Sequence, residues 1–151
     1  MEVRVKVTGI EKLVKKLDDL TARPLKNALT RAGLTVEREA KLQVPVDTGR
    51  LRNSITYIVD PSPVPTWVQV GTNVKYARFV ELGTKRHFPP PGALGRWAKK
   101  HGMNAYALAR AISRRGTKAH PYLRPAFEAS RDAIQATLQH AAEEIKARWQ
   151  A

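Results

Sequence analysis

The chain has 151 residues, of which 27 are Lys or Arg and 13 are Asp or Glu, so its formal net charge is +14. It is 42% hydrophobic and has no cysteine, which excludes disulfide scaffolds, thiolate metal sites and a disordered basic tail. The longest apolar run, residues 105–109, is too short to span a bilayer, and the first residues lack the apolar region of a signal peptide. The composition therefore predicts a soluble, strongly basic domain with acidic partners and no membrane contact.

The first predicted elements are a strand and two helices. Valines alternate with polar residues over residues 2–8, which predicts a half-buried strand, and residues 11–20 have the apolar spacing of a short helix. A long helix follows, capped by Thr21 with a proline tolerated in its first turn, and ended by Pro45. Gly33 in mid-helix indicates a bend or a close crossing. The apolar stripe of this helix consists of Leu25, Ala28, Leu29, Ala32, Val36 and Ala40.

The next predicted elements are an antiparallel pair of strands and a short helix. Residues 55–59 and 67–70 are rich in β-branched and aromatic residues, and the three prolines between them indicate a loop. Residues 76–82 have the pattern of a short helix that ends at Gly83. The apolar side chains of this helix that are available for burial are Tyr76, Phe79, Val80 and Leu82.

The last predicted elements are helical. Residues 94–100 and 105–115 form two short helices, Gly116 ends the second, and a final helix runs from Pro121 nearly to the end of the chain. The stripe of the final helix consists of Phe127, Ile134, Leu138, Ala141, Ile145 and Trp149.

Together the elements predict an α+β fold. A small antiparallel sheet of about three to four strands is packed by the long helix and the long C-terminal helix. We expect a single domain over residues 1–151, with a basic helical arm at residues 85–119 inserted within it.

The positive charge is concentrated in and around this arm, because no acid occurs between Glu81 and Glu128. Such a window is either a face that is solvated or paired with acids elsewhere in an assembly, or a patch that contacts phosphates. Charge runs alone do not decide between these interpretations. The residues that could contact DNA or a partner are Lys85, Arg86, Arg96, Lys99, Lys100, Arg110, Arg114, Arg115 and Lys118.

Asp47-Thr48-Gly49 matches the active-site tripeptide of aspartic proteases, in which two such Asp residues share a proton. The protease Asp ends an apolar strand, whereas here Val44-Pro45 directly follows a long helix. We therefore favour local hydrogen bonds to backbone amides and an unusual φ at the glycine. The histidines lack metal-ligand spacing and no acid–base pair is positioned, so we predict no enzyme activity, no cofactor and no metal site.

A helix-turn-helix is a further alternative, since residues 94–115 have the outline of helix, short turn and basic helix. Asn104 and the neighbouring basic residues could face DNA. The first helix is short, and the apolar residues of the second are suited to packing as much as to reading bases, so sequence-specific recognition is disfavoured.

Three segments follow one another in a characteristic order: VPVDTGRLRNSI at residues 44–55, VGT at 70–72 with YARFVELGT at 76–84, and HPYLRPA at 120–126. In this order they resemble the small minor tail component family (neck, or tail-completion, proteins) of long-tailed double-stranded DNA bacteriophages. The motif residues that the resemblance assigns to assembly or backbone shape are Asp47, Thr48, Gly49, Leu51, Gly71, Tyr76, Glu81, Gly83, Thr84, Pro121, Leu123, Arg124 and Pro125.

The chain departs from the family pattern in two places. The family often has an aromatic residue at the position of Leu82, and many members lack residues 85–119. The departure puts the role of the arm in doubt. Two interpretations of Arg124 stay open. In the first, its side chain forms an ion pair that is buried or lies between subunits, with Glu81 as one possible partner. In the second, its side chain faces solvent.

The resemblance implies a non-enzymatic virion protein at the head–tail junction, made in the host cytoplasm. Copies would form a ring around the DNA path, with sixfold symmetry favoured over twelvefold, between a head-side connector and tail-tube or tail-terminator proteins. Non-specific contact with double-stranded DNA is possible in such a ring. The alternative hypothesis is a stand-alone, sequence-nonspecific DNA-binding module that uses residues 85–124.

Overall fold

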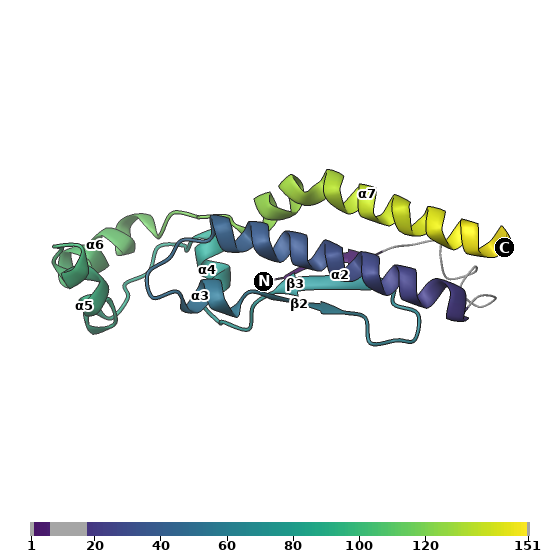
Figure 1. Ribbon diagram of the computed structural model, residues 1–151. Helices are drawn as coiled ribbons and strands as arrows, with labels where there is room; N and C mark the ends of the chain where they lie inside the picture. The colour runs from purple at the N-terminus through teal and green to yellow at the C-terminus, as the bar shows by residue number, and fades with distance from the viewer. Residues whose placement is uncertain (1, 7–17, 151) are drawn as a thin grey trace. The chain divides into compact units, whose positions relative to one another are not determined.

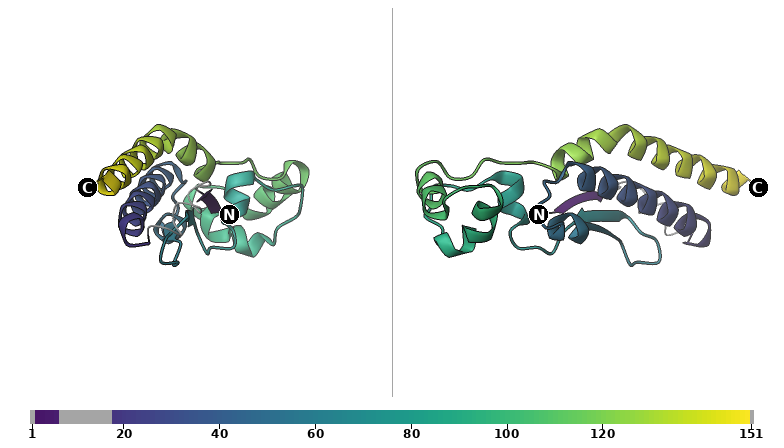
Figure 2. Two further views of the ribbon diagram at one scale, coloured as in Figure 1. Left: turned by 90° about the vertical axis from the view of Figure 1, so that its right-hand side faces the viewer. Right: turned by 60° about the vertical axis from the view of Figure 1, so that its left-hand side comes forward.

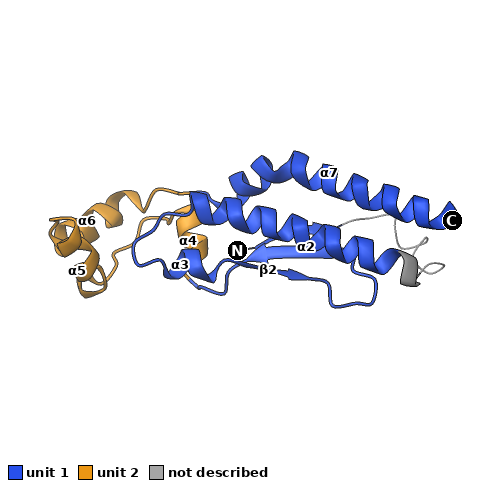
Figure 3. Cartoon of the chain, in the orientation of Figure 1, with its two compact units in different colours: residues 1–75, 121–151 blue, residues 76–120 orange. Residues whose placement is uncertain are grey.

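The computed structural model describes residues 2–6 and 18–150 (Figure 1). The chain divides into two compact units, one of residues 1–75 and 121–151 and one of residues 76–120 (Figure 3). The predicted arm, residues 85–119, belongs to the second unit. The predicted helix at residues 11–20 falls mostly outside the described residues.

The first unit is built on a three-stranded antiparallel sheet. Strands β1 (Glu2–Lys6), β2 (Thr56–Val59) and β3 (Trp67–Gly71) lie in the order β1-β3-β2. Val3 and Val5 of β1 stand opposite Val70 and Val68 of β3, so one face of the sheet is lined with valine. The predicted N-terminal strand and the predicted antiparallel pair are confirmed, as is the α+β class.

Helix α2 (Asp18–Gln43) covers the valine face of the sheet through contacts with β2 and β3. Gly33 marks the close crossing that the sequence suggested, because a Cβ at this position would lie 2.8 Å from side-chain atoms of both Tyr57 and Val68. The apolar stripe is confirmed. Its six residues, each at most 3% exposed, are Leu25, Ala28, Leu29, Ala32, Val36 and Ala40.

The predicted start of this helix is wrong. The chain is already helical at Asp18, the first described residue of this segment, so Thr21 lies inside the helix, almost completely buried, rather than capping it. Pro24 is therefore inside the helix, where it cannot donate the backbone hydrogen bond of an ordinary residue. The burial of Thr21 and Pro24 offsets the lost hydrogen bond. Sequence propensity alone does not reveal this burial.

Helix α7 (Leu123–Gln150) packs along α2 and also contacts β1 (Figure 2). Its predicted stripe is only partly correct. Ile134 and Ala141 are buried, but Trp149 is 57% exposed. Small residues in the first half, Ala126 and Ser130, are buried instead, because two helices approach closely where side chains are small.

The second unit contains α4 (Ala77–Leu82), α5 (Pro91–Lys100) and α6 (Ala105–Arg115). The two predicted short helices are confirmed, although the first begins three residues earlier than expected, and α5 and α6 pack against each other as a helical hairpin. Asn104 caps α6, since its Oδ1 accepts hydrogen bonds from the backbone amides of Tyr106 (2.9 Å) and Ala107 (3.1 Å). Among the described helices of both units, none is long and apolar enough to cross a membrane.

Candidate functional site

The Asp47-Thr48-Gly49 segment forms the corner between α2 and a short helix, α3 (Arg50–Ser54), that the sequence did not predict. Gly49 has φ +78°, in the left-handed region, and its carbonyl accepts a hydrogen bond from the amide of Asn53 at 2.9 Å. The hydroxyl of Thr48 accepts one from the amide of Arg50 at 3.4 Å. The segment therefore shapes the backbone at a helix start, where glycine is the residue that adopts this φ without strain.

Leu51 and the end of α3 attach this corner to the sheet. Leu51 is 5% exposed, and Ser54 donates to its carbonyl at 2.8 Å. The hydroxyl groups of Ser54 and Thr72 lie 2.6 Å apart, so α3 is tied to the chain that leaves β3. Gly71, which precedes Thr72, is the last residue of β3 and pairs with Glu2 of β1 and with Thr56 of β2. The VGT segment thus acts as a structural anchor.

The loop between β2 and β3 is closed by Asp60. Its carboxylate accepts hydrogen bonds from the amide of Ser62 (3.1 Å) and from the amide (2.9 Å) and hydroxyl (3.0 Å) of Thr66. Burial alone would raise the pKa of Asp60, but these hydrogen bonds stabilise the charged form and lower the pKa to about 2.

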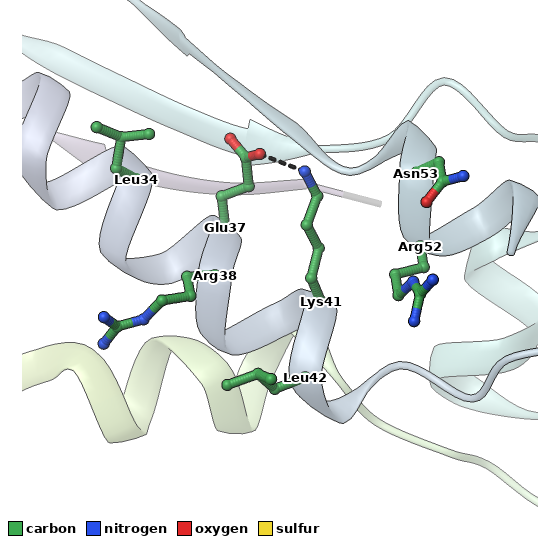
Figure 4. A pocket seen from close by; sticks show the side chains of 7 residues that line it. All are labelled: Leu34, Glu37, Arg38, Lys41, Leu42, Arg52 and Asn53. Atoms are coloured by element: carbon green, nitrogen blue, oxygen red, sulfur yellow. Dashed lines mark hydrogen bonds and ion pairs between the residues drawn. The ribbon is translucent and has the colours of Figure 1, made fainter.

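A groove with a volume of about 400 Å³ lies between α2 and α3 (Figure 4). Leu34 and Leu42 are 49% and 74% exposed here, which is unusual for leucine on a helix that otherwise buries its apolar side chains. Glu37 and Lys41, which lie between these two leucines along α2, form an ion pair with each other. The α2–α3 groove is lined by Leu34, Glu37, Arg38, Lys41, Leu42, Arg52 and Asn53.

Helix α4 has its apolar side chains on the exposed side, contrary to the expectation that they are available for burial. Tyr76, Phe79 and Leu82 are 42%, 44% and 69% exposed, whereas Glu81 is 2% exposed and Ala77 is fully buried. The guanidinium of Arg78 lies 4.7 Å from the centroid of the Phe79 ring. We call Tyr76, Phe79 and Leu82 the α4 apolar face; it has the composition of a contact surface.

The two ends of the arm are joined at its base by two Gly-Thr pairs. Thr84 and Thr117 form an isolated antiparallel bridge, with the amide of Thr84 donating to the carbonyl of Thr117 at 3.2 Å. Their hydroxyl groups lie 2.9 Å apart. Gly83 and Gly116 have φ of +72° and +73°, and a Cβ on Gly116 would lie 2.0 Å from the carbonyl oxygen of Thr84. Only glycine fits such a close approach of two backbones.

The sequence analysis identified Gly83 and Thr84 as motif residues. It predicted only that Gly116 ends a helix, and it assigned no role to Thr117. The signal that could have found them is the dipeptide itself, since Gly-Thr occurs at 83–84 and again at 116–117, on either side of the arm.

The nine basic residues singled out in the sequence are all exposed. The unit of residues 76–120 has ten Lys and Arg and one acid, Glu81, for a net charge of +9. Because Glu81 is buried, every exposed formal charge of this unit is positive. In the described part of the chain, no group of three or more His, Asp or Glu could hold a metal ion.

The Pro121–Pro125 segment starts α7. Tyr122 and Leu123 are fully buried, so this segment is anchored in the core of the first unit. The side chain of Arg124 is 79% exposed and donates to Glu128 at 3.0 Å, one helical turn away. The side chain of Arg124 is thus largely exposed in the isolated chain, and a further ion pair with Glu81 or with another subunit stays a prediction.

Comparison with known proteins gave one match. Residues 9–83 match the HK97-gp10-like family, described as "Bacteriophage HK97-gp10, putative tail-component". The matched region contains the first motif segment and all of the second except Thr84, and it ends just before the arm begins. No curated protein and no solved structure matched the chain.

Proposed function

We propose that the chain forms a ring at the head–tail junction of the virion, around the DNA path, because residues 9–83 match the HK97-gp10-like family of bacteriophage tail components. In this position it would contact the head-side connector on one side and a tail-tube or tail-terminator protein on the other. Six copies are favoured over twelve. The protein acts by shape and contact and has no catalytic role.

The observation that carries the ring is the pair of unlike apolar surfaces on one chain. The α2–α3 groove exposes Leu34 and Leu42, and the α4 apolar face exposes Phe79 and Leu82. Two different surfaces that each need a partner support heterologous contacts between copies, and such contacts form closed rings when the rotation between neighbours closes. A twofold dimer would instead use one surface twice.

The motif residues support the same role. Gly49, Thr72 and Thr84 fix backbone corners that present these surfaces. None of them is a nucleophile or a general base in a cleft, so their chemistry suits assembly.

Native mass spectrometry and light scattering of the purified full chain test the ring, together with an extract assay in which it is added to heads and tails made without it. We expect a closed oligomer, six copies in the favoured case, and restored joining of heads to tails. A chain that stays monomeric at high concentration and fails to restore joining would refute the proposal.

The second candidate is a stand-alone DNA-binding module, which the net charge of +9 on residues 76–120 favours. It predicts that the monomer binds duplex DNA with full affinity and has no activity in the joining assay. Binding that requires the oligomer would remove this candidate.

A further inference from the structure

We propose that strand β2 is the site at which two free copies of the chain bind each other, as a twofold pair that joins their two three-stranded sheets into one continuous sheet. The partner is thus a second copy of this chain. The inference goes beyond the proposed function, because a ring between a head-side connector and a tail protein has two different sides, and neighbours within it are not related by a twofold axis. The pair forms between free copies before the junction is built.

The sheet has two edge strands, and only one of them is protected by charge. Strand β1 has Glu2, Arg4 and Lys6 at alternate positions, and charged side chains on an edge hinder the addition of a further strand. Strand β2 lies at the other edge (Figure 1) and contains no charged residue, no proline and no bulge. An edge of this kind is open to pairing with another strand.

The backbone of β2 has hydrogen-bonding groups that point away from the sheet. The amide of Asp60 donates to the carbonyl of Trp67 at 3.0 Å, which makes these two residues a hydrogen-bonded pair of the β2–β3 ladder. Such pairs alternate along an antiparallel ladder, so Ile58 also bonds to β3, whereas the amides and carbonyls of Tyr57 and Val59 face outward. Within the described part of the chain, these outward groups have no hydrogen-bond partner.

One twofold register satisfies all of these outward groups. When Ile58 of one copy stands opposite Ile58 of the other, Tyr57 stands opposite Val59 on both sides of the centre, and each such pair exchanges two hydrogen bonds. A register centred on Val59 would place Tyr57 opposite Pro61, which has no amide hydrogen to donate. A register centred on Tyr57 would place Val59 opposite Ile55, whose amide already donates to a carbonyl of α3. The outward groups therefore select the register centred on Ile58.

The side chains agree with this register. Tyr57 packs beside Gly33 of α2, so Ile58 points to the other face of the sheet, where it is 58% exposed. Its counterpart in the second copy would cover it, because side chains lie closest in a pair that is not hydrogen-bonded. On the α2 side, Tyr57 would stand opposite a valine, and aromatic and β-branched side chains stabilise each other across strands. Because β2 has no charged residue, no like charges of the two strands are brought together.

Strand β1 of a second copy is a less suitable partner for β2. Its outward positions are all charged, and Arg4 is already engaged. The guanidinium of Arg4 donates to Oε1 of Gln69 at 2.7 Å and lies 4.8 Å from the centroid of the Trp67 ring. Pairing with β2 would place these charges beside uncharged side chains such as Ile58, with no group of opposite sign on that strand. A second, uncharged β2 fits better.

Single cysteines test the register directly, because the chain has none of its own. The variant Ile58→Cys places two thiols opposite each other, at a Cα separation of about 4.5 Å that a disulfide can span. The matched control is Thr56→Cys, on the same face of the same strand and also exposed. In this register the two copies of position 56 are about 14 Å apart, at about 3.4 Å per residue, which is too far for a disulfide.

The full-length variants are oxidised with copper phenanthroline over a series of protein concentrations, and the dimers are quantified on a non-reducing gel. We expect Ile58→Cys to cross-link at least tenfold faster than Thr56→Cys at each concentration, with circular dichroism showing that both variants are folded. Equal rates in both variants would indicate random collision, and no cross-link in either would indicate a free β2 edge. Either result would overturn the inference.

A second experiment changes the charge at the centre of the pair. Ile58→Lys and Ile58→Glu should each weaken the twofold pair at least tenfold, because two like charges then stand opposite each other. An equimolar mixture of the two variants should pair again, and an affinity tag on one of them captures the mixed pair. A mixture that pairs no better than its components would overturn the register. Tighter pairing by Ile58→Glu alone would assign the edge to Arg4 of β1 instead and would also overturn it.

These readouts are independent of the ring. Cross-linking through position 58 is scored whether the copies are single chains or closed rings. Failure of the ring proposal is seen separately, as the lack of a closed oligomer in native mass spectrometry of the wild type.

Discussion

At the scale of single residues, the motif positions act mainly by fixing backbone geometry. Asp60 lies outside the motif segments but has the same kind of role, because its carboxylate holds the β2–β3 loop through Ser62 and Thr66. Its pKa in the folded protein, about 2, lies below the ordinary value of 3.8. A group with a depressed pKa stabilises the fold above its unfolded pKa and loses this contribution as the pH falls toward the folded pKa.

The variant Asp60→Asn should therefore lower the free energy of unfolding by about 1 kcal/mol at pH 7, since the hydrogen bonds lose their charged acceptor. The difference from wild type should shrink as the pH falls from about 4 toward 2, because Asp60 of the unfolded chain becomes protonated in this range while the folded carboxylate stays ionised until the pH nears 2. Urea unfolding at several pH values measures this, with Asp132→Asn, an exposed acid on α7, as control. A difference that is independent of pH would contradict the assigned role.

Gly33 shows how closely α2 approaches the sheet. Alanine there would gain about 1 kcal/mol of helix propensity but would place a methyl group 2.8 Å from Tyr57 and Val68. Overpacking of this kind costs about 1–3 kcal/mol, so Gly33→Ala should destabilise the chain by about 1 kcal/mol.

Thermal or urea unfolding measures this change, and Gly95→Ala is the matched control. Gly95 also lies inside a helix, but a Cβ there meets nothing within 4 Å, so that variant should be neutral or stabilising. Stabilisation by Gly33→Ala would show that the crossing is looser than described.

At the scale of elements, hydrophobic periodicity predicted most of the fold. The stripe from Leu25 to Ala40 and the strands at 56–59 and 67–71 are where the sequence places them. The errors share a physical cause. The start of α2 at Asp18, the short helix α3 and the outward-facing α4 depend on tertiary packing or on partners, and local patterns do not contain that information.

The candidate site was predictable to a similar degree. The fixed backbone at Gly49 and Gly83 follows from the residue type. The bridge between Thr84 and Thr117 and the groove at Leu34 and Leu42 do not, because they bring together segments distant in the sequence.

The base of the arm gives an element-scale prediction. The variant Gly116→Ala should break the bridge, because its φ of +73° is strained for alanine and its Cβ would collide with the Thr84 carbonyl. We expect the amide of Thr84 to lose most of its protection from hydrogen exchange while amides in α2 keep theirs. Gly92→Ala, in an open position on α5, should leave both unchanged. Protection at Thr84 that survives Gly116→Ala would contradict this account.

At the scale of the whole molecule, the family match covers residues 9–83, whereas most of the basic unit, residues 84–120, lies outside it. The charge divides in the same way, +5 in the first unit and +9 in the second. The two units can therefore be changed and tested separately.

The variant Leu42→Asp tests this separation at the α2–α3 groove. A charge at this 74% exposed position should cost little folding stability but should shift the oligomer toward monomer by at least tenfold in the apparent association constant, because a buried unpaired charge in an interface is costly. Native mass spectrometry over a concentration series measures it. Met103→Asp, an exposed apolar residue in the α5–α6 turn, should leave the oligomer intact. Equal effects of both changes would exclude the groove as the interface.

The bridge at the base of the arm also has a mechanical consequence. The chain enters and leaves the arm beside a few hydrogen bonds, those between Thr84 and Thr117 and the one from the amide of His120 to the carbonyl of Val80. These bonds hold the two chains at the base of the arm side by side, so a change within α5 and α6 should leave the separation of residues 84 and 117 unaltered.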